Sequence, residues 1–131
     1  AYIVRVVFDA MPDDTERLRV MGNGHLLRTA VVNVLENACK FSPDHVALVR
    51  LQATDGQLQI QVENALAPGT FSDEDRARIF EPFYRIRGTT QVKGYGIGLS
   101  LAQRIVSIHN GAITFQIHEN RVFVTMRFPS L

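Results

Sequence analysis

Two asparagines, a lysine and an aromatic residue are spaced so that a single side of a helix would carry all of them. Asn33, Asn37, Lys40 and Phe41 follow one another at positions i, i+4, i+7 and i+8, which places them within a sector of about 100°. Amide oxygens suit hard cations such as Mg²⁺, and an ammonium group suits phosphate oxygens. The same spacing also fits the water-facing side of an ordinary amphipathic helix, so the pattern alone leaves both interpretations open.

A glycine-rich turn comes directly before a second predicted helix. Residues 94–99 read Gly-Tyr-Gly-Ile-Gly-Leu. Glycine lets the backbone approach a phosphate closely, and free N–H groups at the start of a helix favour anions. The turn is not a P-loop, since no Gly-Lys-Ser/Thr follows, and Leu101 stands where a dinucleotide-binding motif would need Gly or Ala. By itself the segment fits a phosphate cradle or a flexible hinge.

A third group of residues combines aromatic side chains with a cation. Residues 80–85 read Phe-Glu-Pro-Phe-Tyr-Arg. Aromatic residues on both sides of a proline are typical of core packing, which is the role we expect for Phe80 and Phe83. Tyr84 and Arg85 are then predicted to face a ligand.

Periodicity predicts the elements that must position these residues. Two helices are predicted over residues 25–41 and 98–109, and a short one begins at a capping box formed by Ser72 and Asp75. A hairpin turn is expected at Asp55-Gly56. Strands are predicted over residues 2–8, 18–21, 46–54, 57–64, 112–117 and 122–128, with an exposed, mobile loop over 84–96. The expected fold class is α/β (α+β), a two-layer sandwich of a mixed, mostly antiparallel sheet with helices on one face.

Composition excludes several classes of protein. The chain has 131 residues, of which 46% are hydrophobic, so we expect a single domain over residues 1–131. Fourteen basic and 13 acidic residues leave a formal charge of +1, which argues against a nucleic-acid partner. No apolar run reaches the roughly 18 residues of a membrane span. The single cysteine, Cys39, indicates a reducing compartment, and the start at Ala1 without Met suggests a fragment of a longer protein.

In this order and at these separations, the motif from Asn33 to Phe41, residues 80–85 and residues 94–99 resemble the catalytic, ATP-binding domain of bacterial sensor histidine kinases. The resemblance covers nearly the entire chain. It implies a Bergerat-type α/β sandwich, the fold shared with type II topoisomerases, Hsp90 chaperones and mismatch-repair ATPases, and it implies ATP and Mg²⁺ as cofactors.

The resemblance also assigns roles to individual residues. Asn37 matches the asparagine that binds Mg²⁺, and Asn33 matches its helper one turn earlier. Lys40 matches a residue facing the phosphates, and Arg85 matches a cation of the lid near the γ-phosphate. The implied nucleotide contacts are Phe41 beside the adenine, with Glu63, Asn64, Tyr84, Arg87, Gly94, Gly96, Ile97, Gly98 and Leu99.

One motif of the family is altered in this chain. Family members usually carry Asp-x-Gly-x-Gly after the third strand, and the aspartate accepts a hydrogen bond from the adenine amino group. Residues 63–69 here read Glu-Asn-Ala-Leu-Ala-Pro-Gly, so Glu63 is the nearest acid and Ala65 replaces a glycine. The expectation is an adenine contact that is shifted or water-mediated. The alternative is a degenerate module that binds ATP weakly or not at all and acts as a protein-interaction or regulatory domain.

Asn33 determines which reaction we expect. Hydrolytic relatives have a glutamate at this position that activates water, and an amide cannot act as a general base near neutral pH. Slow attack by water favours transfer of the γ-phosphoryl group to a nucleophile from outside. Glu36 is expected to orient or deprotonate that nucleophile, or simply to be a solvated carboxylate.

The resemblance places the nucleophile in another domain. It is a histidine on a separate helical dimerisation domain, and none of the four histidines here has the family's His-Glu-x-x-x-Pro surroundings. The implied partners are that phosphoacceptor domain of the same protein and a response regulator, with no nucleic acid and no direct membrane contact. The parent is expected to dimerise through a segment absent here, and this domain to be its cytoplasmic portion.

Overall fold

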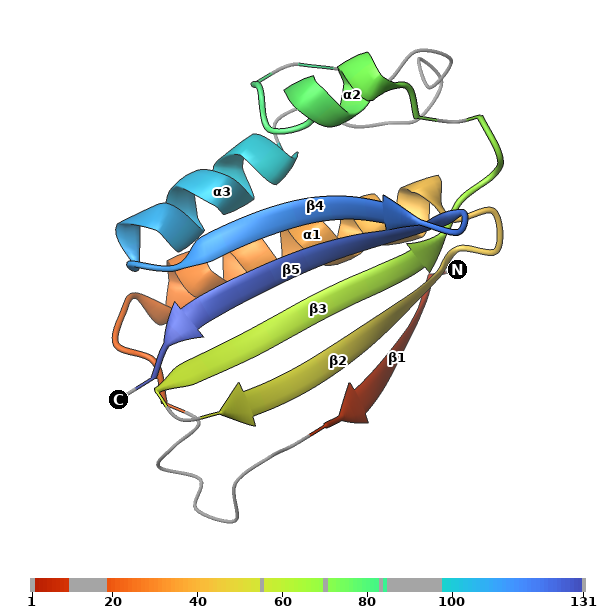
Figure 1. The fold of residues 1–131 in the computed structure, drawn as a ribbon. Coiled ribbons are helices and arrows are strands. Elements are labelled where there is room, and N and C mark those ends of the chain that lie inside the picture. The colour runs from red at the N-terminus through yellow and green to blue at the C-terminus, as the bar shows by residue number, and fades with distance from the viewer. Residues whose placement is uncertain are drawn as a thin grey trace.

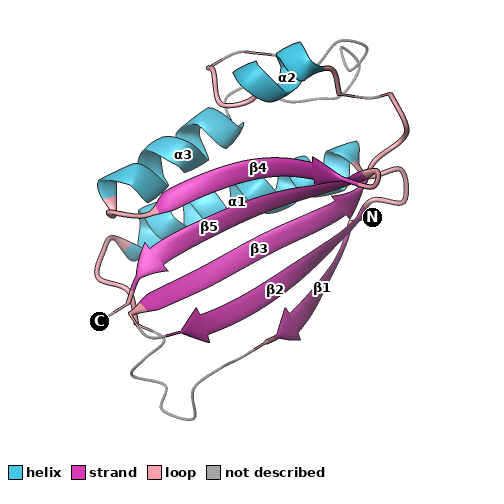
Figure 2. Ribbon diagram, in the orientation of Figure 1, coloured by secondary structure: helices cyan, strands magenta, loops and turns pink. Residues whose placement is uncertain are grey.

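The structure is a two-layer sandwich of a sheet and helices. It is a computed structural model that describes residues 2–9, 19–54, 56–69, 71–82, 84 and 98–130. Figures 1 and 2 show two long helices behind one face of the sheet, while the other face is open. The elements are β1 (Ile3–Phe8), α1 (Gly24–Phe41), β2 (Val46–Thr54), β3 (Gln57–Ala65), α2 (Asp73–Arg78), α3 (Gly98–Ile108), β4 (Ala112–His118) and β5 (Arg121–Pro129). The predicted fold class is confirmed.

The sheet is mixed and mostly antiparallel. Its five strands lie in the order β1-β2-β3-β5-β4. Strand β1 pairs with β2 in parallel, and the remaining neighbours pair antiparallel. Helix α1 connects the two parallel strands, because parallel neighbours need a crossover rather than a tight turn. The sheet therefore carries α1 across its back, where the first group of candidate residues lies.

The β4-β5 hairpin closes through a two-residue turn. Glu119 and Asn120 have φ values of 49° and 60°, and His118 pairs with Arg121 across them. Two consecutive left-handed residues make the turn whose twist suits adjacent antiparallel strands. The hairpin predicted at Asp55-Gly56 also forms. Gly56 has a φ of 75°, whereas Asp55 lies outside the described residues.

The core lies between the helices and the sheet. Helix α1 contributes the buried side chains of Ala30, Val34 and Ala38, in agreement with the predicted apolar stripe. The helix begins at Gly24, one residue earlier than predicted, because the side chain of Asn23 caps it by accepting a hydrogen bond from the Leu26 N–H at 3.0 Å. Further buried members of the core are Val62, Leu99, Ala102, Ile105, Val106, Val124, Met126 and Phe128.

A buried histidine ties the two long helices together in antiparallel orientation. His109 follows the end of α3, and its Nδ1 lies 2.7 Å from the carbonyl oxygen of Ile105. Its Nε2 accepts a hydrogen bond from the backbone N–H of Asn23 at 3.0 Å. An acceptor at Nε2 requires the proton of the neutral ring to be on Nδ1. The C-terminal end of α3 is therefore fixed to the N-terminal end of α1.

Two details differ from the sequence-based expectations, and a third expectation lies outside the described residues. The predicted short strand over 18–21 is wrong, since residues 19–21 are irregular and residue 18 is outside the described residues. This segment leads into the Asn23 cap of α1 instead of pairing with the sheet. The short helix that begins at the capping box is expected from its apolar pattern to include Phe80, but α2 ends at Arg78 and Phe80 lies in the following turn. The predicted mobile loop, apart from Tyr84, lies outside the described residues, as does Phe83.

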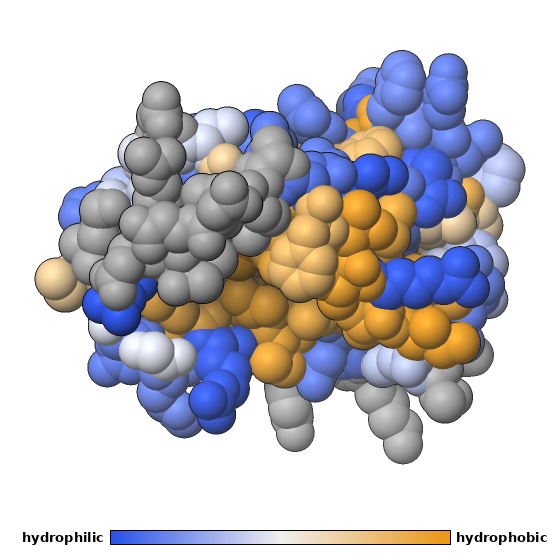
Figure 3. Space-filling view, turned by 90° about the horizontal axis from the view of Figure 1, so that it is seen from below, coloured by the Kyte–Doolittle hydropathy of each residue, from blue (hydrophilic) through white to orange (hydrophobic). Residues whose placement is uncertain are grey.

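Strand β1 leaves an apolar edge exposed. All six of its residues are exposed, and five of them are apolar. Figure 3 views the molecule from the side on which β1 lies and shows apolar side chains gathered there. No helix among the described residues combines the length and the apolar character needed to cross a bilayer.

Candidate functional site

Three of the predicted site residues lie on one flank of α1 and have no side-chain partner among the described residues. Asn33, Asn37 and Lys40 are each half-buried. Within the described part of the chain, neither carboxamide hydrogen-bonds to another group and no carboxylate pairs with Lys40. None of these polar atoms is both fully buried and unsatisfied. Two amides and an ammonium group are thus held at the margin of the core, where a ligand can reach them.

The start of α3 lies close to these residues. Helices α1 and α3 pack against each other, and His109 holds their opposite ends together. Because helices rise about 1.5 Å per residue, Gly98 lies roughly level with the turn of α1 that carries Asn33 and Asn37. Figure 1 shows α3 on one side of α1 and β1 on the other. With Val34 facing the sheet, the right-handed turn of α1 directs the two asparagines to the α3 side.

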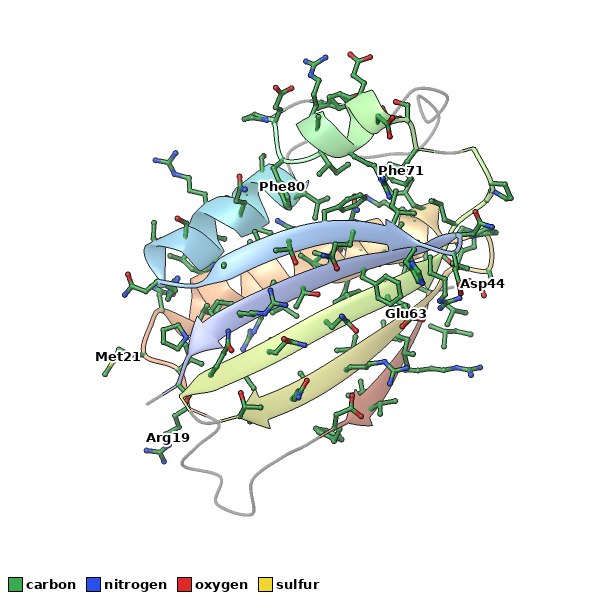
Figure 4. All side chains as sticks on the ribbon, viewed as in Figure 1. Arg19, Met21, Asp44, Glu63, Phe71 and Phe80 are labelled. Atoms are coloured by element: carbon green, nitrogen blue, oxygen red, sulfur yellow. The ribbon has the colours of Figure 1, made fainter. Side chains whose placement is uncertain are left out.

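Phe41 belongs to an aromatic cluster at the C-terminal end of α1. Its ring centroid lies 6.0 Å from that of Phe71, and Phe71 lies 5.5 Å from Phe115 of β4. The rings are tilted, as aromatic pairs prefer, and Figure 4 shows Phe71 near the end of the sheet below α2. Sequence reasoning missed Phe71 and Phe115. The only signal for Phe71 was an isolated aromatic residue beside the capping box of α2.

The structure separates Glu63 from the other site residues. In β3, Val62 and Asn64 face the helices, with 0% and 2% exposure, so Glu63 takes the opposite face, as Figure 4 shows. There its carboxylate accepts a hydrogen bond from Arg121 and lies 3.8 Å from Arg50. These ion pairs explain why an acidic residue stands on the open face. The polar side chain of this motif on the helix side is that of Asn64.

Asn64 is placed in the core layer. It pairs in register with Ala47 and Val122, which are both buried. Its Nδ2 donates to the carbonyl oxygen of Ala65 at 2.7 Å. With Nδ2 engaged in this hydrogen bond, the amide oxygen is the atom of the side chain that can accept a hydrogen bond from a ligand.

Tyr84 is anchored to α2. Its hydroxyl donates to Asp75 Oδ1 at 2.5 Å, and the Arg78 guanidinium lies 4.6 Å from its ring centroid. Asp75 also accepts from the Ser72 N–H at 2.8 Å, which completes the predicted capping box. The hydrogen bond to Asp75 raises the pKa of Tyr84 to about 12, because the neutral phenol is the donor. Tyr84 therefore holds α2 to the chain directly before residue 85.

Replacing Tyr84 with Phe should remove one late step from the tyrosine titration. In the native chain, ultraviolet absorbance should show one of the three tyrosines ionising near pH 12, with the pKa of Tyr84 at about 12. A raised pKa in the folded state adds stability that is complete below the ordinary tyrosine pKa of about 10 and is lost as pH rises toward 12. Tyr2→Phe is the control and should retain the late step. A late step that survives Tyr84→Phe would contradict the assignment.

Other predicted residues are placed differently or are not described. Leu99 is 5% exposed in the core, so only its backbone can face a ligand. Glu36 is exposed on α1, next to Asn37, where an incoming group could reach it. The remaining predicted contacts lie outside the described residues: Arg85, Arg87, Gly94, Gly96 and Ile97.

Two hollows can be described from the part of the chain that the structure places, and neither is lined by an asparagine of α1. One, of about 560 Å³, lies between α2 and β4 and is lined by Arg76 and Phe115. The other, of about 430 Å³, lies near His109 at the far end of α1. The first adjoins the aromatic cluster, because Phe115 belongs to both. The chemistry of the side chains, rather than the volume of either hollow, therefore locates the candidate site.

The donor set on α1 fits a hard divalent cation bound together with an anion. No group of three or more His, Cys, Asp or Glu side chains comes together among the described residues, so a cage made of protein ligands alone is not seen there. Mg²⁺ is commonly held by few protein oxygens together with phosphates and water. Half-buried amide oxygens from Asn33 and Asn37, with Lys40 for the anion, match that arrangement.

Comparison with known proteins places the chain among ATP-binding domains. Residues 22–130 match the family model described as histidine kinase-, DNA gyrase B- and HSP90-like ATPase. The chain is 34% identical to the sensor histidine kinase CusS of Escherichia coli strain K12, over 91% of this chain and 27% of CusS. It is 39% identical to the adaptive-response sensory kinase SasA of Nostoc sp. strain PCC 7120, over 66% of this chain and 22% of SasA. The chain thus spans about a quarter of these relatives.

A solved structure shows the same fold. The catalytic domain of histidine kinase ThkA superposes with a TM-score of 0.76 and 23% identity, covering 97% of this chain and 79% of that one. ThkA is also known in complex with the response regulator protein TrrA. At this level of identity the structural similarity establishes only the fold. The functional comparison rests on the sequence relatives CusS and SasA.

Proposed function

Since the chain belongs to the family of histidine kinase-, DNA gyrase B- and HSP90-like ATPases, we propose that it binds Mg-ATP and donates the γ-phosphoryl group to a histidine on a separate phosphoacceptor domain. One observation carries this proposal. Two half-buried carboxamides, which hydrogen-bond to no group in the described part of the chain, lie on α1 beside the start of α3. The sensor kinases among its relatives favour a histidine as the acceptor.

Asn37 is assigned to the metal, with Asn33 one turn earlier as its helper. Bound Mg²⁺ would supply charge neutralisation on the phosphates. Lys40 is placed to pair with phosphate oxygens. The backbone at the start of α3 offers N–H groups to an anion, and Arg85, Arg87 and the glycines before α3 are proposed to complete the phosphate contacts.

The adenine contact is assigned to Asn64 rather than Glu63. Asn64 lies on the helix side of β3 and is 2% exposed, and its amide oxygen can accept a hydrogen bond from an amino group. Glu63 faces the other way and pairs with Arg121. Phe41, in contact with Phe71, provides an aromatic surface near the same end of α1. This arrangement offers a purine both a hydrogen-bond acceptor and stacking contacts.

Asn64→Ala should weaken the binding of ATP and ADP by the same factor, about 10-fold, because both nucleotides carry adenine and one buried hydrogen bond is lost. Isothermal titration calorimetry measures both affinities. Glu63→Gln is the matched variant on the adjacent residue. It should leave both affinities unchanged and lower the free energy of unfolding by about 1 kcal/mol, because its partly exposed ion pairs are lost. Weaker nucleotide binding in Glu63→Gln would return the adenine contact to Glu63.

Phosphoryl transfer rather than hydrolysis follows from Asn33. An amide at this position cannot accept a proton from water near neutral pH, so water bound there stays a poor nucleophile. Glu36 is exposed beside Asn37 and is proposed to orient or deprotonate the incoming histidine. The acceptor is oriented by the domain that carries it, and this chain contributes positioning and charge.

The wider context of the chain is proposed on the same basis. Residues 1–131 are taken as one catalytic domain of a longer sensor kinase that dimerises through another segment and acts in the cytoplasm. The phosphorylated histidine would then pass its phosphoryl group to an aspartate of a response regulator. No direct contact with nucleic acid or with the membrane is proposed for this domain.

Two measurements test the proposed function. The purified chain should bind a non-hydrolysable ATP analogue more tightly with Mg²⁺ than without it. With labelled ATP it should form almost no phosphohistidine until a phosphoacceptor domain is added. Strong self-phosphorylation or steady hydrolysis by the chain alone would contradict transfer to a separate domain. An absence of saturable binding at about 1 mM nucleotide would indicate a degenerate module.

A further inference from the structure

Strand β1 presents apolar side chains on both faces at the edge of the sheet. Its parallel register with β2 places Val4, Val6 and Phe8 on the face that carries α1, in line with buried residues such as Ala47. Ile3 and Val7 take the open face. All of these β1 side chains are exposed, Phe8 to 67%. Such an edge is unusual for an unpaired strand, since natural edges are normally charged or covered.

No strand of the described residues pairs with the outer side of the β1 backbone. The N–H of Ile3 donates to His45 at 3.0 Å, and the N–H of Asp9 donates to Leu51 at 2.8 Å. Odd-numbered residues therefore direct their N–H and C=O groups toward β2, and even-numbered residues direct theirs outward. Val4, Val6 and Phe8 thus offer a row of hydrogen-bonding groups to another strand.

We propose that this edge pairs with the same edge of a second copy of the chain, in antiparallel orientation about a two-fold axis at Val6. A closed two-fold contact uses one surface patch twice and leaves no edge open. With the axis at Val6, the outward-facing Val4 lies opposite Phe8 of the second copy. The pairing extends from Ile3 to Asp9, the full length over which β1 follows β2.

Charge disfavours the register with its axis at Arg5, and backbone pairing disfavours the one with its axis at Val7, which would engage only Val6 and Phe8 of the outward-facing residues of β1. Arg5 is the only charged residue within β1, and Asp9 follows its end. An axis at Arg5 would set the two arginines directly opposite each other, which is unfavourable. With the axis at Val6, each Arg5 lies opposite Val7 and one diagonal step from both Asp9 and Arg5 of the second copy. Asp9 lies 3.8 Å from Arg50 of its own chain, and the pairing adds Arg5 of the second copy as a further ion-pair partner. Antiparallel pairing about this axis therefore brings the positive Arg5 of each copy near the negative Asp9 of the other.

The dimer is expected to be weak. One pair of short strands buries far less than the roughly 1,600 Å² of a standard protein interface. A dissociation constant between about 10 µM and about 1 mM corresponds to such a contact. The association should not depend on nucleotide, because β1 and α3, toward which the asparagines of α1 are directed, lie on opposite sides of α1 in Figure 1.

Sedimentation equilibrium of the chain from about 1 µM to about 1 mM tests the proposal. The native chain should shift from monomer to dimer within this range. Val6→Lys places two like charges at the axis and should weaken association at least about 10-fold. Met21→Lys is the matched control, because Met21 is an apolar residue 72% exposed away from β1, and it should dimerise like the native chain. Circular dichroism confirms that both variants are folded.

Disulfide trapping tests the register. Val6→Cys should form a covalent dimer on mild oxidation, because position 6 faces itself across the axis. Val4→Cys should do so at least about 10-fold more slowly, because position 4 faces position 8. The native Cys39 is buried, so the native chain under the same oxidation serves as the control for disulfides that do not involve the introduced cysteine. A native chain that stays monomeric throughout, unchanged association in Val6→Lys, or equal trapping at positions 4 and 6 would each overturn the proposal.

Discussion

Asn37→Ala should abolish the Mg²⁺ dependence of ATP binding and reduce phosphoryl transfer to an added phosphoacceptor domain at least about 100-fold. Loss of residues that merely support a metal ligand costs about 10- to 100-fold, and Asn37 is assigned as the ligand itself. The side chain is half-buried and makes no hydrogen bond within the described part of the chain. Its removal therefore takes little from the fold, and the loss should appear in metal-dependent binding.

Calorimetric titrations with an ATP analogue, with and without Mg²⁺, measure this effect. In Asn37→Ala the two affinities should become equal, near the value of the native chain without metal. Arg28→Ala is the control on the same helix, because Arg28 is exposed and lies one turn before the site. It should retain the native difference. Asn37→Ala protein that still responds fully to Mg²⁺ would remove Asn37 from the metal site.

Gly111→Ala should lower the free energy of unfolding by about 2 to 4 kcal/mol. Gly111 lies between α3 and β4, where a Cβ would fall well inside van der Waals contact with the carbonyl oxygen of Arg127. It would also lie 2.9 Å from Val106 Cγ1 and 3.2 Å from Phe128 Cδ1. Arg127 is paired in the β4-β5 ladder, so its carbonyl cannot move aside without breaking the sheet.

Urea denaturation followed by circular dichroism measures this loss. Gly24→Ala is the matched control, because a Cβ at Gly24 meets nothing within 4 Å. Gly24 is also the first residue of α1, where alanine favours the helix. Gly24→Ala should therefore be neutral or slightly stabilising. Equal midpoints for Gly111→Ala and the native chain would show that the α3-β4 junction is more deformable than the packing implies.

Much of the fold followed from local patterns. The apolar stripe of α1, the capping box at Ser72 and the Asp55-Gly56 turn each depend on neighbours a few residues away. Short-range rules therefore located the two long helices and the hairpins to within one or two residues. The predicted strand over residues 18–21 failed because the Asn23 cap, whose backbone is held by His109 from the other end of the chain, draws this segment toward α1.

The candidate site was predicted only in part. The spacing of Asn33 and Asn37 placed both on one flank of α1, and their exposure in the structure agrees with that placement. The choice between Glu63 and Asn64 could not be made in the same way. Residues next to each other on a strand face opposite sides, and only the sheet register shows which side carries the helices.

The sequence by itself determined the elements, the family resemblance and the row of polar side chains on α1, because helix periodicity and short motifs are written in residues near one another. The tertiary structure decided which face of β3 meets the helices, how His109 joins α3 to α1, and that Phe71 and Phe115 extend the aromatic surface of Phe41. These depend on contacts between distant segments. Their energies come from burial and pairing, which arise only once the sheet and helices are packed together.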